Sequence, residues 1–277
     1  PRVVTVVLSG GVLALSGLVF QTVFSNPLVS PDVLGATNGC AVGAIFAMLF
    51  FPSLPFFSQL SAFLCGLVSV IASLSLASFV RQNSLLGLIL SGMVIGSLAS
   101  AVLMILKYCA DPMHQLPAIE YWLMGGFQNA VWEDVWSILL CSTLPVVFLY
   151  FLRFPLKVLS LGDERAMSLG LSPLFIRRSA ILFATILVAS VISVAGMVSW
   201  VALIAPHLVR VCGARDITSN MGTIFCCGGS LLLLADLFAR TLTTAEIPVS
   251  IFTSLFGASL LMVLLLCGIL EHREVNV

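Results

Sequence analysis

Long apolar runs, separated by short polar or proline-rich stretches, follow one another along almost the whole chain. A helix needs about 20 such residues to cross a hydrocarbon layer roughly 30 Å thick. Breaks such as NPLVSPD, FPSLPF, DPMHQLP and GARD carry the residues typical of turns. The pattern predicts nine membrane-spanning helices, over residues 3–24, 35–52, 57–80, 85–107, 131–152, 176–195, 197–212, 220–240 and 246–270.

The composition also indicates a membrane protein. Of the 277 residues, 60% are hydrophobic and only 9% are charged, and the mean hydropathy is +1.17. Soluble domains carry about 25% charged residues, so this sequence cannot cover a water-exposed surface. We therefore predict a single all-α, polytopic membrane domain over residues 1–277. The formal net charge is zero, and no basic tail indicates nucleic-acid binding.

No pattern in the sequence indicates catalysis, a cofactor or a metal site. The sequence has no Gly-Lys dipeptide, which excludes a P-loop, and its three histidines lie far apart with no HExxH motif. The eight cysteines lie mostly within apolar runs and form no CxxC pair. We interpret them as small packing residues and not as a disulfide framework.

The basic residues predict which side of the membrane each loop faces, because inner loops carry the excess of Lys and Arg. With nine spans and an outer N-terminus, nine of the twelve basic residues lie inside. The other three, Arg2, Lys107 and Arg240, lie outside. We therefore predict an outer N-terminus and an inner C-terminus.

A second feature is the clustering of polar groups in VSWVALIAPHLVRVCGARD, residues 198–216, around His207. A metal site, a proton relay and the end of a membrane helix are open interpretations. The neighbourhood of His207 supplies no further metal ligands, which disfavours a metal site. Within the spans, Asp236 and Arg240 are four residues apart and can pair on one helix face. One such acid is too few for a proton relay.

The longest hydrophilic segment, residues 153–175, lies on the predicted inner side. Its centre, from Ser160 to Leu169, has the pattern of a short amphipathic helix that Gly170 can end. A solvated loop is the alternative, and the pattern alone does not decide between them.

Small residues at four-residue spacing mark places where membrane helices can approach closely. They are Gly39 and Gly43, and then Gly92, Gly96 and Ser100. Close packing is one interpretation. The other is a path for a bulky solute lined by these small side chains, and the sequence leaves both open.

Five longer motifs occur in a fixed order: GGVLALSGLVFQTVFSNPLVSPDVLGATNGCAVGA, YWLMGGFQNAVWEDV, LSLGDERAMSLGL, GMVSWVALIAPHLVRVCGARD and LLLLADLFARTLTTAEIPVSIFTSLFGA. In these motifs the chain resembles the FecCD family, the membrane permeases of ABC importers for iron-siderophores, haem and cobalamin, with molybdate or tungstate relatives. The resemblance covers essentially the whole chain. Family members have about ten spans, and this sequence begins where the second would start, so we expect the first family helix to be absent from it.

The resemblance implies an all-helical type II ABC importer permease in the inner (cytoplasmic) membrane. A second permease subunit, in a homodimer, would enclose the path between the two copies. A cytoplasmic ABC ATPase would bind below and hydrolyse ATP, and an extracytoplasmic substrate-binding protein would dock above. The chain itself would be no enzyme and would hold no cofactor.

The family motifs also imply roles for single residues on the inner side and along the path. Two inner gates match Asn26 and Leu28, and Ser84, Leu85 and Leu86. The helix that carries Gly92, Gly96 and Ser100 matches the one that lines the path.

Other matched residues concern the protein partners. The segment that couples to the ATPase matches Gly162, Asp163, Glu164, Ala166, Leu169 and Gly170. Arg2 and Arg240 match outer arginines that pair with acidic residues of the binding protein. His207, Arg210 and Arg215 are then interpreted as groups at the inner interface, near the ATPase.

Three alternatives to metal-chelate import stay open. A molybdate or tungstate oxyanion importer would differ by cargo and not by architecture. An ion-coupled secondary transporter would work without an ATPase. A signalling or scaffold membrane protein would carry no solute.

Overall fold

The computed structural model describes residues 1–80, 85–213 and 218–266, and in these ranges the chain is built from helices without strands. In chain order the helices are α1 (Arg2–Val23), η1 (Pro31–Leu34), α2 (Ala36–Phe50), α3 (Pro55–Ser78), α4 (Leu85–Cys109), α5 (Gln115–Leu123), α6 (Trp132–Phe151), α7 (Arg153–Leu159), α8 (Asp163–Ser168), α9 (Pro173–Ala195), α10 (Val201–Val211), η2 (Thr218–Asn220), α11 (Met221–Thr241) and α12 (Val249–Leu266). The predicted all-α membrane fold is confirmed.

Six of these helices, α1, α3, α4, α6, α9 and α11, are long and apolar enough to cross a membrane. Shorter apolar helices, α2, α10 and α12, occupy the other three predicted spans. With its 11 residues, α10 is only about 16 Å long, roughly half the thickness of the hydrocarbon layer. The prediction of one span over 197–212 is therefore wrong in its length.

The helix α10 is short because the backbone between α9 and α10 is not helical. Gly196 and Trp200 both have φ 70, and the residues between them are not helical. Ser250 Oγ donates a hydrogen bond to the backbone oxygen of Met197 and so satisfies one polar group of the break. Such partners let irregular backbone exist at membrane depth, where water is absent.

A second break precedes α2, where Gly35 has φ 75 and separates it from η1. Ser73 Oγ donates to the Leu34 backbone oxygen at 3.0 Å, and Ser69 Oγ donates to the Gly35 backbone oxygen at 2.9 Å. Serines on α3 thus bind both carbonyl groups at the break, and the Gly35 oxygen also accepts the first helical hydrogen bond of α2 from the Gly39 N–H at 3.0 Å.

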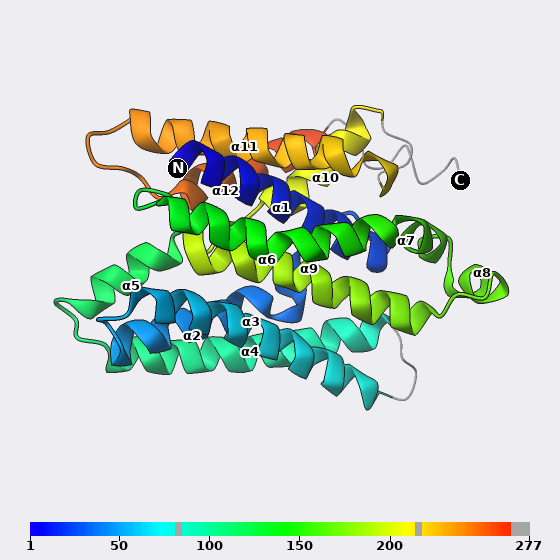
Figure 1. Ribbon diagram of the computed structural model, residues 1–277, viewed down its shortest axis with the longest axis horizontal. Coiled ribbons are helices and arrows are strands. Elements are labelled where there is room, and N and C mark those ends of the chain that lie inside the picture. Colours follow the sequence, from blue (N-terminus) through cyan, green and yellow to red (C-terminus); the bar gives the residue numbers. More distant parts are fainter. Residues whose placement is uncertain (81–84, 214–217, 267–277) are drawn as a thin grey trace.

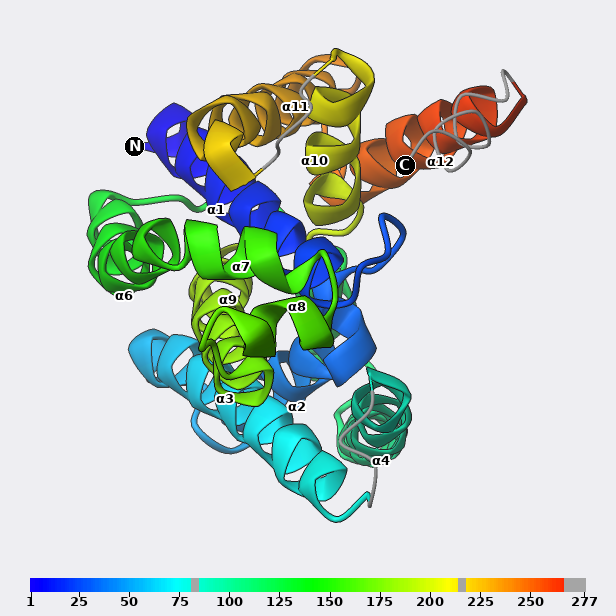
Figure 2. The ribbon, with the colours of Figure 1, turned by 90° about the vertical axis from the view of Figure 1, so that its right-hand side faces the viewer.

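The central helix of the bundle is α1, which packs against α11, α10, α9 and α6. Figure 2 shows it between the pair α10–α11 and the helices α7 and α9. A Cβ atom placed on Gly10 would lie 2.3 Å from the backbone oxygen of Gly228. The backbones of α1 and α11 are therefore in direct contact, as small residues permit between membrane helices.

The bundle has two distinct ends. The start of α1 and the helix α5 lie at one end, whereas α7 and α8 lie at the other (Figure 1). Neither α5 nor α7 is among the predicted helices, because both are too short to give a membrane-length apolar run. Under the predicted orientation, the α8 end is the inner one, and the two are called the α8 end and the α5 end below.

Candidate translocation and coupling sites

The predicted coupling segment contains a helix, α8, at one end of the bundle (Figure 1). Gly162 before it has φ 112 and Gly170 after it has φ 75. These are conformations that glycine adopts without strain. An added Cβ on either glycine would have no other atom within 4 Å. Glycine is therefore favoured here by the positive φ and not by a close contact.

A bidentate ion pair fixes α8 to α9. Arg177 Nη1 and Nη2 donate to the Asp163 carboxylate at 2.7 and 2.6 Å. The Arg177 side chain is only 10% exposed, and planar two-point pairing of this kind is strong and directional. The sequence does not predict this ion pair, because its two residues are 14 positions apart and no local pattern links them.

The six residues predicted for coupling therefore have different surroundings. Asp163 binds Arg177, and Ala166 is fully buried. Glu164 and Leu169 are exposed, and the Asp163 side chain is still 43% exposed while it binds Arg177. Leu161 and Met167, which the sequence analysis did not single out, are exposed beside them. Exposed apolar side chains gathered at a charged helix are typical of an interaction site. We call Leu161, Glu164, Met167 and Leu169 the α8 surface.

The first predicted gate is a tight turn after α1. The backbone N–H of Leu28 donates to Asn26 Oδ1 at 2.9 Å, which is the local turn that asparagine favours. The Leu28 side chain is exposed at the tip. Leu86 is exposed and Leu85 is half-buried at the start of α4, whereas Ser84 lies outside the described residues. Both gate segments belong to the α8 end (Figure 1).

The small residues of α4 turn inward, toward the same subunit. A Cβ on Gly92 would lie 2.2 Å from the Val33 backbone oxygen. Asn38 Nδ2 donates to the Gly96 backbone oxygen at 3.2 Å and to Ser100 Oγ at 2.9 Å. Gly92 and Gly96 are thus buried in close helix packing, as the first interpretation predicts.

The opposite side of α4 is apolar and exposed, and so is one side of α12. In α4 this face consists of Leu86, Leu90, Met93, Val94, Leu98, Val102 and Ile105. In α12 it consists of Ile251, Leu255, Met262, Val263 and Leu266. Figure 2 shows α12 projecting from the bundle on the same side as α4. We call these two faces together the α4–α12 face.

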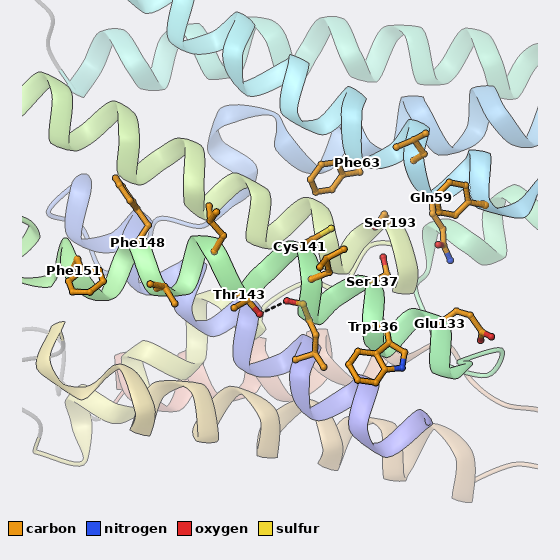
Figure 3. A pocket seen from close by; sticks show the side chains of 16 residues that line it. Gln59, Phe63, Glu133, Trp136, Ser137, Cys141, Thr143, Phe148, Phe151 and Ser193 are labelled. Atoms are coloured by element: carbon orange, nitrogen blue, oxygen red, sulfur yellow. Dashed lines mark hydrogen bonds between the residues drawn. The ribbon is translucent and has the colours of Figure 1, made fainter.

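A separate groove of about 1300 Å³ lies between α3 and α6 (Figure 3). Phe63, Cys141 and Phe148 are typical of its apolar lining, and Gln59 and Glu133 lie near one end. Of the predicted gate residues that the structure describes, Asn26, Leu28, Leu85 and Leu86, none lines it. The described residues include no group of three or more His, Cys, Asp or Glu side chains that could hold a metal.

The end of α10 is more buried than the sequence indicates. His207 is buried among the helices and only 6% exposed. Arg210 Nη2 donates to Gln21 Oε1, and Gln21 Nε2 donates to the Leu203 backbone oxygen at 3.0 Å. This network ties α10 to α1. Arg215 lies outside the described residues.

Four charged side chains gather at the other end of the bundle. Arg2 Nη2 lies 2.7 Å from Asp236 Oδ1, and Arg2 Nη1 lies 2.8 Å from Glu246 Oε1. Arg240 Nε lies 3.9 Å from Asp236 Oδ2, which confirms that these two residues pair. The Asp236 side chain is fully buried, so it needs these cations. We call Arg2, Asp236, Arg240 and Glu246 the rim cluster.

Comparison with known proteins identifies several relatives. The model of the FecCD transport family matches residues 1–267. The molybdate import permease MolB of Haemophilus influenzae is 38% identical over 269 residues, which are 95% of this chain and 78% of MolB. The vitamin B12 import permease BtuC of Salmonella typhi is 35% identical over 274 residues, with 96% and 81% covered. An iron chelatin transport permease of Helicobacter pylori is 33% identical, with 96% and 80% covered.

Solved structures give the same result. One described as a metal-chelate type ABC transporter in an inward-facing conformation matches with a TM-score of 0.88 and 37% identity. The match covers 96% of this chain and 86% of the other. Together with the membrane-length helices, these matches show a multi-pass membrane protein. The chain belongs to the FecCD transport family of ABC importer permeases.

Proposed function

We propose that this chain forms the translocation pathway of an ATP-driven importer for a metal chelate of the iron-siderophore, haem or cobalamin class. The observation that carries the proposal is the TM-score of 0.88 with a metal-chelate type transporter over 96% of the chain. The vitamin B12 and iron chelatin permeases among the relatives support the same cargo class. The chain resides in the cytoplasmic membrane, and a separate ABC ATPase hydrolyses the ATP.

A second copy of the chain completes the pathway in this proposal. The α4–α12 face is available for this contact, because both of its parts are apolar, exposed and on the same side of the bundle. The solute passes between the two copies. Alternating access then comes from shifts between inward-open and outward-open packings, which ATP-driven closure of the ATPase biases.

The α8 surface is the contact for the ATPase in this proposal. The Asp163–Arg177 pair holds α8 against α9, so a push on α8 moves a membrane-length helix with it. The turn after α1, with Leu28, and the start of α4, with Leu86, form the inner gate at this end of the bundle. Arg2 and Arg240, at the opposite end, face the substrate-binding protein.

A second candidate cargo is molybdate or a related oxyanion. Its specific support is the 38% identity with the molybdate permease MolB. Vitamin B12 and iron chelatin relatives of similar identity, and the metal-chelate structure, favour the chelate. Architecture does not separate the two cargoes, so the test has to measure the solute.

The first experiment measures total cellular iron, cobalt and molybdenum by mass spectrometry, with and without the gene, under limitation of each element in turn. We expect a selective loss of iron or cobalt when the gene is deleted. A selective loss of molybdenum would establish the oxyanion importer instead. No change in any of the three would contradict both cargo classes.

The same uptake measurement, made in cells with an inactive ATPase partner or with an added ionophore, separates an ATP-driven importer from the other classes. Uptake should stop when the ATPase partner carries an inactive nucleotide site, and it should resist an ionophore as long as ATP is maintained. Uptake that survives loss of the ATPase and collapses with the ionophore would indicate an ion-coupled secondary transporter. No solute flux under any condition would indicate a signalling or scaffold role.

A further inference from the structure

Among the described residues, three Lys or Arg side chains lie at the α5 end, and each is ion-paired inside the chain. Arg2 pairs with Asp236 and Glu246, and Arg240 pairs with Asp236. Lys107 Nζ lies 2.6 Å from Glu120 Oε1. An acidic partner that approaches this end therefore meets, in the part of the chain that the structure describes, Lys and Arg side chains that already lie beside a carboxylate.

The two sides of the Arg2 guanidinium have different partners. Nε and Nη2 donate to Asp236 at 3.1 and 2.7 Å, toward the interior. Nη1 donates to both carboxylate oxygens of Glu246 at 2.8 Å, toward the surface. Asp236 is fully buried, whereas the Glu246 side chain is 37% exposed. The inner contact is thus shielded from any partner, and the outer one is open to competition.

The loop between α11 and α12 positions Glu246 for this contact. The backbone N–H of Ile247 donates to the Ala239 oxygen at 3.0 Å, which folds the loop back onto the end of α11. Thr243 Oγ1 donates to the Ala245 backbone oxygen and closes a turn inside the loop. Glu246 follows directly and reaches Arg2, which lies 244 positions away in the chain.

We propose that Glu246 is an intramolecular competitor for the acidic partner, and that docking requires an incoming carboxylate to replace Glu246 on Nη1 of Arg2. The proposal rests on the proposed docking role of Arg2 and adds the residue that regulates it. Asp236 keeps Arg2 in place during the exchange, because its contact lies on the other side of the guanidinium. Glu246 therefore limits both how fast and how tightly the partner docks.

The charges of the rim cluster predict how removal of Glu246 would change the docking of an acidic partner. Two arginines balance Asp236 and Glu246, so the cluster is formally neutral. Removing the Glu246 charge leaves one net positive charge at the surface. A positive rim attracts an acidic partner more strongly, and the effect falls as salt screens it.

The test compares Glu246→Gln with Glu120→Gln in the reconstituted permease–ATPase complex. Glu120→Gln removes one acidic charge at the same end but leaves Arg2 untouched. The probe is the purified substrate-binding protein that stimulates ATP hydrolysis by the wild-type complex, and its dissociation constant is measured at low and high salt. We expect Glu246→Gln to lower this constant roughly fivefold at low salt, the size of an exposed ion pair, and Glu120→Gln, which changes the net charge equally but leaves the Arg2 contacts intact, to lower it much less.

Several outcomes would overturn the inference. Equal constants for Glu246→Gln and wild type, or equal gains in both variants, would exclude specific competition at Arg2. Weaker docking of Glu246→Gln would show that Glu246 contacts the partner or orients Arg2 for it. Glu246→Ala repeats the test should Glu246→Gln assemble poorly. If no substrate-binding protein binds the wild-type complex, the proposed function fails at docking, which is distinct from failure of the competition alone.

Discussion

At the scale of single residues, the coupling segment separates into side chains that hold α8 in place and side chains that a partner can reach. Asp163 belongs to the first group because it binds Arg177, although its side chain is 43% exposed, and Glu164 belongs to the second. The two acids are adjacent in the sequence, and the same family motif matches both. The structure thus predicts different consequences for the same kind of substitution.

We expect Asp163→Asn to lower stability and Glu164→Gln to leave it nearly unchanged. Asp163→Asn leaves the largely buried Arg177 without its carboxylate, which costs about 1–3 kcal/mol. Thermal unfolding of the purified permease measures this difference. Equal melting temperatures for the two variants would contradict the anchoring role of Asp163. Glu164→Gln should reduce ATPase binding alone, since its side chain is exposed.

At the scale of helices, the structure depends on backbone contact between α1 and α11. A Cβ on Gly228 would lie 2.3 Å from the Gly10 backbone oxygen and 2.4 Å from Ala14 Cβ. Both neighbours belong to the central helix, which cannot move away without disturbing α9 and α10. Gly222 lies on the same helix α11, and no atom would lie within 4 Å of its Cβ.

We expect Gly228→Ala to destabilise the protein by roughly 1–3 kcal/mol through overpacking. The matched change Gly222→Ala should stabilise it slightly, because alanine favours a helix over glycine by about 0.5–1 kcal/mol. Melting temperatures of the two variants in the same detergent measure the difference. The close-contact interpretation would be wrong if Gly228→Ala melted at or above the temperature of the wild type.

The helices also show how far the sequence predicts the fold. Apolar runs placed nine helices because burial in lipid requires length and low charge, which are both local properties. They placed a break at residue 196 but not its extension to Trp200, since Trp200 adopts a positive φ that only its surroundings enforce. They did not give α5 or α7, which are held by tertiary packing and are too short for a membrane signal.

At the scale of the whole molecule, the candidate sites depend on contacts that no local pattern contains. Arg2 and Asp236 are 234 positions apart, and the sequence analysis paired Asp236 with Arg240 alone. The sequence left two interpretations of Gly92 and Gly96, close packing or a lining of the path. Their contacts with η1 and with Gly35 after it come from a segment that is distant in the sequence. Family motifs indicated which segments matter, whereas the structure separates their anchoring residues from their exposed ones.

The proposed second copy gives a prediction at this scale, through two exposed leucines on different faces. Leu255 on α12 is 59% exposed and belongs to the α4–α12 face. Leu140 on α6 is 82% exposed and lines the groove between α3 and α6. Tryptophan is apolar enough for either surface when lipid covers it, but it is too large for a packed interface between proteins. Leu255→Trp should therefore disrupt a dimer that Leu140→Trp leaves intact.

Native mass spectrometry of each variant, released from lipid nanodiscs, measures the share of dimer directly. We expect mostly monomer for Leu255→Trp and mostly dimer for Leu140→Trp and wild type. Loss of the dimer in Leu140→Trp alone would move the interface to the α3–α6 groove. A dimer that tolerates both substitutions would mean that neither face is packed against another copy, and the pathway would then have to lie elsewhere than between two α4–α12 faces.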